Sequence, residues 1–120
     1  GEPAWSALTR PLLSLVERGA CAGVTSALAV TELLTGPLRQ GDEGLATEYR
    51  RWLAAFPNLE VVPVGVEIAE TAARLRARHG IRTPDALHLA TALVAGADAF
   101  VTADTRLRRV REIEVLPLRP

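Results

Sequence analysis

The sequence predicts an α/β fold, a three-layer sandwich with a mainly parallel sheet, in a single domain that spans residues 1–120. The chain has 120 residues, of which 48% are hydrophobic, so it is large and apolar enough for one compact core and too short for two domains. Short β-branched segments alternate with segments of helical periodicity along the whole chain. This alternation favours parallel strands joined by right-handed helical crossovers.

The helices of the first half of the chain are recognised by their apolar spacing and their end signals. Leucine and valine residues recur near helical spacing over residues 8–18. Ser26 can accept a hydrogen bond from the backbone at the start of a helix over residues 27–35. Gly36 and Pro37 stand where helices commonly end, so we expect this helix to stop before them. The strands of this half are expected at residues 23–25 and 59–64.

Three further helices and one short helix are expected in the rest of the chain. A helix over residues 42–55 is followed by a proline and an asparagine, and a helix over residues 66–78 closes at Gly80. The helix over residues 83–95 opens with Thr83, which can cap, followed by a proline at the first helical position and an acid near the positive end of the dipole. The remaining elements are expected at residues 99–102 (strand), 104–110 (short helix) and 113–116 (strand).

The composition excludes several common kinds of site. All fourteen basic residues are arginines, and P-loop nucleotide binding, Schiff-base catalysis and phospho-receiver signalling all use a lysine. Two histidines and one cysteine are too few for the usual zinc sites, and no Gly-x-Ser-x-Gly motif is present. Carboxylates are the chemistry that remains.

The sequence also predicts a soluble, cytoplasmic protein. No apolar run approaches the ~20 residues of a membrane span, and no signal peptide precedes the first helix. The single cysteine, Cys21, cannot form an internal disulfide, which suits a reducing compartment. The formal net charge is zero, so any contact with nucleic acid depends on local clusters of arginine.

Three acids stand at positions where a parallel sheet places functional residues. Asp85 lies in the first turn of a helix, and Asp104 follows the strand that ends at Thr102. Glu32 lies in the middle of a helix that is apolar nearly all round, so we expect its carboxylate to be partly removed from water and compensated. Each acid alone also has an ordinary explanation: an arginine partner or solvent exposure for Glu32, a first-turn acid for Asp85, and an N-cap for Asp104.

Taken together, these segments resemble the PIN-domain family. The resemblance rests on Thr-Pro-Asp-Ala-Leu-His-Leu-Ala-Thr-Ala-Leu from Thr83, on Ala-Asp-Ala-Phe-Val-Thr-Ala-Asp ending at Asp104, and on Ser-Ala-Leu-Ala-Val-Thr-Glu ending at Glu32. The run from Leu75 to Ile81 is similar to the ribonuclease toxins of bacterial toxin–antitoxin pairs. The resemblance covers about residues 3–118.

The resemblance implies a divalent-metal-dependent endoribonuclease. Glu32, Asp85 and Asp104 are then the catalytic residues and the metal ligands, since clustered carboxylates repel one another unless a cation neutralises them. Oxygen ligands select Mg²⁺ or Mn²⁺, and a metal-bound water then hydrolyses the RNA phosphodiester. A cognate antitoxin protein is the implied partner.

The chain departs from the family in its first strand, which in the family is central and ends in an aspartate. This sequence has no aspartate before Asp42, so we expect the first central strand, and with it the first ligand, to be missing. Loss of a central strand would leave strand edges unpaired, which predicts a homodimer or other self-association. The alternative function is a catalytically impaired PIN-like module that binds protein.

Neighbouring residues have two explanations each. The hydroxyl of Thr102 either orients a carboxylate or a water, or is an ordinary strand-end threonine. Arg78, Arg82 and Arg106 flank the acids in sequence and are candidate RNA contacts, although solvated helix faces explain them equally well. His88 lies one turn after Asp85 on the same face, and we expect it to be a packed residue outside the site.

Overall fold

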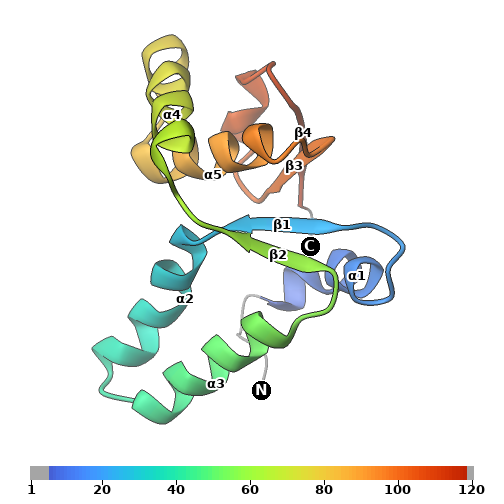
Figure 1. The fold of residues 1–120 in the computed structure, drawn as a ribbon, viewed down its shortest axis with the longest axis vertical. Helices are drawn as coiled ribbons and strands as arrows, with labels where there is room; N and C mark the ends of the chain where they lie inside the picture. Colours follow the sequence, from blue (N-terminus) through green and yellow to red (C-terminus); the bar gives the residue numbers. More distant parts are fainter. Residues whose placement is uncertain (1–5, 119–120) are drawn as a thin grey trace.

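The computed structural model describes residues 6–118, and its α/β character confirms the predicted fold class (Figure 1). The expected loss of a first strand concerns the chain before Ser6, which lies outside the described residues. The described residues form the α-helices α1 Ser6–Glu17, α2 Leu28–Arg39, α3 Glu43–Ala55, α4 Val66–His79 and α5 Thr83–Val94. They also form the strands β1 Gly23–Ser26, β2 Leu59–Val62, β3 Ala99–Thr102 and β4 Glu114–Pro117, and the 3₁₀ helix η1 Thr105–Arg109.

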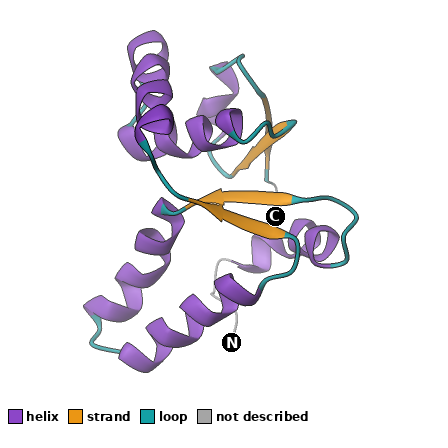
Figure 2. Cartoon of the chain, in the orientation of Figure 1, coloured by secondary structure: helices purple, strands orange, loops and turns teal. Residues whose placement is uncertain are grey.

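The strands pair in parallel, as predicted, but in two separate pairs. β1 pairs with β2, with Gly23 opposite Leu59, and β3 pairs with β4, with Ala99 opposite Glu114 (Figure 2). Within residues 6–118 no ladder joins the two pairs, so the predicted continuous sheet is instead divided. In the described part of the chain, β1 and β3 therefore each form a hydrogen-bonded ladder with a strand on one side only. Helix α5 contacts both strands and connects the two halves.

The main core lies between α4, α5 and the C-terminal strand pair. Ala86, Leu89 and Ala90 of α5 are fully buried, and alanine at two of these positions lets neighbouring backbones approach closely. In Figure 1, the β1–β2 pair lies between this cluster and the α2–α3 pair. The cluster consists of Ile68, Ala72, Leu75, Ile81, Ala86, Leu89, Ala90, Ala92, Leu107, Val110 and Ile113.

Helix α2 is longer than predicted, because Gly36 and Pro37 do not end it. The helix continues to Arg39, with Pro37 inside it and buried. The fixed φ of proline is compatible with a helix, and this position is in the last turn, where the missing N–H removes a single bond. At the other end of α2 the N-cap is Ala27 and not the expected Ser26, although the hydroxyl oxygen of Ser26 accepts a hydrogen bond from the N–H of Leu28 at 3.0 Å.

Helix α5 begins as predicted, but its capping differs. The N-cap residue is Arg82, which makes no side-chain capping bond, and Thr83 is already helical. Helix α4 ends at Gly80, whose φ of 64° is the left-handed conformation that glycine adopts without a Cβ clash. None of the helices within residues 6–118 combines the length and the hydrophobicity that a bilayer crossing requires.

Candidate metal site

Asp85 is placed by the start of α5. The turn that carries it is exposed at the end of a buried helix, where unpaired backbone N–H groups favour a negative charge. Its Oδ2 accepts a hydrogen bond from Nε of Arg82 at 3.3 Å, three residues before it. The carboxylate therefore lies beside the connector between α4 and α5, with an arginine as its partner.

Asp104 is placed by the end of β3, where it is the N-cap of η1 as the sequence predicts. Its Oδ1 accepts hydrogen bonds from the backbone N–H and from Nε of Arg106, both at 2.9 Å, and its Oδ2 accepts one from Nη2 of Arg106 at 2.8 Å. Its own N–H donates to the hydroxyl oxygen of Thr102 at 3.0 Å. Thr102 thus holds the backbone of Asp104 in place and contacts its carboxylate only indirectly.

The arginine contacts favour the charged form of Asp104. The Arg106 side-chain hydrogen bonds, followed by the Arg106 backbone N–H, lower the pKa of Asp104 from 3.8 to about 2, with a smaller attraction from Arg82. In return the pKa of Arg106 is raised, first by its hydrogen bonds to Asp104 and also by the charge of Asp85. These four side chains therefore form one electrostatic group.

Asp85 and Asp104 line the same pocket, although 18 positions separate them in the sequence. The pocket has a volume of about 140 Å³ and lies between the α4–α5 connector, the start of α5 and η1. Three arginines share it with the two acids. Its lining residues are Gly80, Ile81, Arg82, Asp85, Asp104, Arg106, Leu107 and Arg109.

Glu32 lies on α2 and does not line this pocket. Its side chain is 52% exposed, so the carboxylate is partly removed from water but the apolar helix does not bury it. The buried residues of α2 are Leu33 and Pro37, and the apolar residues beside Glu32 do not enclose its carboxylate. Its partner is not an arginine either: Oε1 lies 2.6 Å from Nε2 of His88 on α5.

The structure brings two of the three acids directly together and links the third to them only indirectly. Asp85 and Asp104 share a pocket, and Glu32 is joined through His88 to the helix that carries Asp85. Among residues 6–118 no group of three or more acidic, histidine or cysteine side chains is arranged to hold a metal ion. The two aspartates offer hard oxygen donors that suit Mg²⁺ or Mn²⁺, whereas Glu32 would have to exchange its bond to His88 to join them.

The arginines divide into those that reach the acids and those that do not. Arg82 and Arg106 line the pocket, as their positions in the sequence suggested. Arg78 lies apart from it and pairs with Glu112 at 2.8 Å. Arg109, which like Arg106 follows Asp104 closely in the sequence, lines the pocket and donates to the carbonyl oxygen of His79 at 2.8 Å.

Two contacts of the site escaped the sequence interpretation. His88 was expected to be a packing residue, and its spacing from Asp85, one helical turn, was the signal that it could reach the same face. Arg109 follows Asp104 closely in the sequence, but its contact with His79 depends on how η1 packs against the end of α4.

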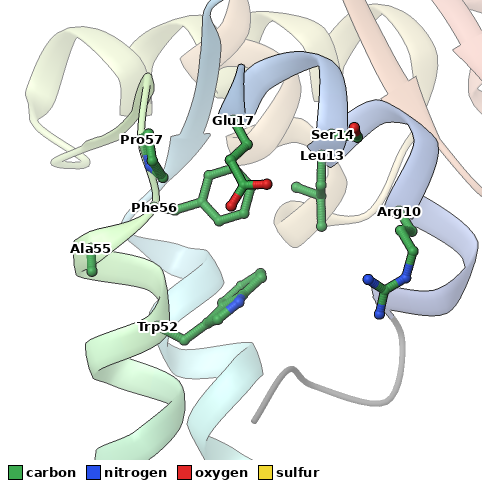
Figure 3. A pocket seen from close by; sticks show the side chains of 8 residues that line it. All are labelled: Arg10, Leu13, Ser14, Glu17, Trp52, Ala55, Phe56 and Pro57. Carbon is green, nitrogen blue, oxygen red and sulfur yellow. The ribbon is translucent and has the colours of Figure 1, made fainter. Parts of the chain in front are cut away.

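A larger cavity, of about 350 Å³, lies between α1 and the end of α3 (Figure 3). Its aromatic wall is formed by Trp52 and Phe56, whose ring centroids are 5.3 Å apart in an edge-to-face arrangement. Glu17 is the one acid among its described lining residues. This cavity lacks the paired carboxylates of the smaller pocket and is therefore not the candidate metal site.

Comparison with known proteins gives a consistent family. The family model of the PIN domain matches residues 5–113. No curated protein sequence matches the chain. Among solved structures, VapBC2 from Rickettsia felis bound to a DNA fragment from their promoter contains a similar chain, with a TM-score of 0.75 and 15% identity over 96% of this chain and 92% of that one. A toxin–antitoxin complex from Klebsiella pneumoniae contains another, with a TM-score of 0.57 and 22% identity over 76% of this chain and 69% of that one.

Proposed function

This chain belongs to the PIN domain family, whose members are generally nucleases, and from that premise we propose that it is a divalent-metal-dependent endoribonuclease. The observation that carries the proposal is the convergence of Asp85 and Asp104 in one pocket that arginines also line. The acids suit a hard cation, and guanidinium groups suit the phosphates of RNA. Water is the nucleophile in such a site, so no side-chain nucleophile is required.

In this proposal each residue has a defined task. Asp85 and Asp104 hold Mg²⁺ or Mn²⁺, and Glu32 joins them when it leaves His88. A cation bound there would supply Lewis acidity for activating water and for stabilising charge on the leaving oxygen. Thr102 keeps the backbone of Asp104 in position through its 3.0 Å hydrogen bond. Arg82 and Arg106 orient the RNA backbone from the rim of the pocket.

We further propose that the chain is the toxin of a toxin–antitoxin pair and acts in the cytoplasm. Support comes from the two similar structures, of which one is described as a toxin–antitoxin complex and the other as VapBC2 bound to a DNA fragment from their promoter. The proposed partners are RNA as substrate, a cognate antitoxin protein and a second copy of the chain. Light scattering of the purified chain tests the last of these, and a stable monomer would contradict it.

The alternative function is a catalytically impaired module that binds protein. One observation favours it: each of the three acids is already paired with a positively charged or neutral partner of its own chain, and the described residues contain no three-ligand group. The two functions differ in their response to cations. A module binds its partner equally well with and without Mg²⁺, whereas a nuclease cleaves RNA only with it.

The test is RNA cleavage by the purified protein with Mg²⁺, with Mn²⁺ and with chelator. Asp85→Asn keeps the size of the side chain and removes its charge, so cleavage should fall by at least about a hundredfold if Asp85 holds the cation. Glu112→Gln, which changes an acid that pairs with Arg78 away from the pocket, is the matched control and should retain activity. Undiminished cleavage in chelator, or a fully active Asp85→Asn protein, would overturn the proposal.

A further inference from the structure

The carboxylate of Asp104 is almost fully engaged by one residue. Each carboxylate oxygen has two lone pairs. Both lone pairs of Oδ1 are used, one by the backbone N–H and one by Nε of Arg106, and Oδ2 accepts Nη2 of the same residue. A divalent cation that approached Asp104 would meet one remaining lone pair and a guanidinium group beside it. Arg106 thus occupies the position that a metal ion requires.

The side chains of Arg82 and Arg106 contact the acids through their guanidinium groups and are otherwise largely exposed. The side chain of Arg106 is 78% exposed and that of Arg82 is 74% exposed, so little packing opposes their movement. Exposed pairs of this kind contribute little to stability, and a competing charge can displace them. The backbone N–H of Arg106 would stay on Oδ1 in such an exchange, because the turn of η1 fixes it.

We propose that Arg106, assisted by Arg82, is an exchangeable counter-ion: it neutralises the acids until a divalent cation binds, and then transfers to the phosphate of the RNA. This inference rests on the proposed nuclease function. The two acids and three arginines of the lining balance to a small positive charge, and a doubly charged cation makes the pocket strongly positive while Arg106, Arg82 and Arg109 still line it. The released guanidinium groups then attract an anion, and a bridging RNA phosphate is the one that the substrate provides.

The exchange couples the two ligands. Since Arg106 cannot serve Asp104 and a phosphate together, the cation raises the affinity for RNA, and RNA raises the affinity for the cation by the same factor. A guanidinium that merely contacted RNA from a fixed position would weaken the cation by repulsion and would not produce this coupling. The difference between these two behaviours can be measured.

The first measurement is calorimetric titration of Mn²⁺ into the full chain without RNA, for wild type and Arg106→Gln. Glutamine keeps the backbone hydrogen bond to Asp104 and removes the competing charge. We expect Arg106→Gln to bind Mn²⁺ about two- to fivefold more tightly, the range that exposed ion pairs produce. Arg78→Gln removes the same charge from a pair outside the pocket and should leave the affinity unchanged.

The second measurement is the affinity for a short single-stranded RNA, by fluorescence anisotropy, in chelator and in Ca²⁺, with the RNA checked for integrity. Arg106→Gln should weaken RNA binding in Ca²⁺ and leave it nearly unchanged in chelator, where Arg106 is held by Asp104. Equal weakening in both conditions would overturn the exchange.

The outcomes separate this inference from the function on which it rests. If wild type binds Mn²⁺ in a manner abolished by Asp85→Asn, and Arg106→Gln binds it no more tightly, the counter-ion role is wrong and the proposed metal site stands. If Arg106→Gln binds Mn²⁺ and wild type does not, Arg106 prevents the cation from binding in the absence of RNA, and the counter-ion role is confirmed. If neither protein binds Mn²⁺, both the metal site and the exchange are wrong.

Discussion

The pair of Glu32 and His88 joins α2 to α5 at the edge of the candidate site. With Oε1 and Nε2 only 2.6 Å apart and Glu32 half exposed, the contact is short but open to solvent. A pair in this setting contributes little to folding. Its importance lies in where it holds the carboxylate, beside His88, which lies one helical turn after Asp85 on α5.

Replacing Glu32 by glutamine separates its role in stability from its proposed role as a metal ligand. Glutamine can still accept a hydrogen bond from His88, so we expect the free energy of unfolding to change by less than about 1 kcal/mol. Loss of the charge should weaken Mn²⁺ binding measured by calorimetry. Glu70→Gln, on the exposed surface of α4, is the control and should change neither quantity. Unaltered Mn²⁺ affinity in Glu32→Gln would exclude Glu32 as a ligand.

The lowered pKa of Asp104 predicts an acid-dependent loss of stability. Because folding lowers this pKa from 3.8 to about 2, the ionised form stabilises the fold above about pH 4, and that contribution is lost as the pH falls toward 2. Arg106→Gln should raise the pKa of Asp104 toward 3.8, which carboxyl NMR titration measures directly. Denaturation of the two proteins should show a stability difference at pH 5 that shrinks near pH 2. A titration of Asp104 unaffected by the substitution would contradict this account.

At the scale of elements, the ends of the helices differ in what they demand of the backbone. Gly80 ends α4 with a positive φ, while Gly36 lies inside α2, and beyond the chain neighbours a Cβ on either residue would meet no atom within 4 Å. The two glycines differ in backbone conformation, and Gly36 also precedes Pro37, whose ring crowds a Cβ on a preceding helical residue.

Alanine should have unequal effects at these two positions. Gly80→Ala forces a side chain into the left-handed region and should destabilise the protein by about 1 kcal/mol. Gly36→Ala gains helix propensity, but its Cβ crowds the ring of Pro37, so the free energy of unfolding should change by less than about 0.5 kcal/mol. Chemical denaturation of both variants measures the difference. An equal loss of stability in the two variants would contradict the left-handed conformation of Gly80.

Elements with strong local signals could be predicted from the sequence. Helices α3 and α4 have regular apolar spacing together with local end signals in Asp42 and Gly80, and their observed bounds agree with the predicted ones to within a residue. The end of α2 could not be predicted in this way, because burial of Pro37 outweighs the usual effect of proline. Neither could the division of the sheet, since strand pairing depends on distant segments.

The same distinction applies to the candidate site. Convergence of Asp85 and Asp104 was predictable, because parallel strands and their following helices bring such loops to one edge. The exposure of Glu32 was not, since the apolar sequence around it does not reveal which face of α2 is covered. The partners of His88 and Arg109, namely Glu32 and His79, could not be predicted, because these contacts depend on how separate helices pack.

At the scale of the whole molecule, α5 is the element on which both strand pairs depend. Leu89 is 0% exposed at the centre of the main core cluster, between α4 and the C-terminal strands. Leu89→Ala should therefore destabilise the protein by about 2–5 kcal/mol, through lost burial and the cavity that remains. Val66→Ala removes apolar atoms from a residue that is 75% exposed and should cost less than about 0.5 kcal/mol. Comparable losses in thermal denaturation of the two variants would argue against this core.

Buried residues are unevenly distributed between the two halves of the molecule, and this difference determines how readily each half opens. The main cluster is built entirely from residues between Ile68 and Ile113, whereas α2 and α3 bury only Leu33, Pro37, Ala46 and Leu53. Segments with few buried contacts open locally at a lower free energy than the global transition. Amide protons of α3 should therefore exchange with deuterium well before those of α5, and the α2–α3 hairpin should fluctuate open while the pocket of Asp85 and Asp104 remains closed. The helix that carries Glu32 thus opens more often than the segments that carry the two aspartates. One ligand of the proposed site therefore moves in and out of reach on a faster timescale than the other two.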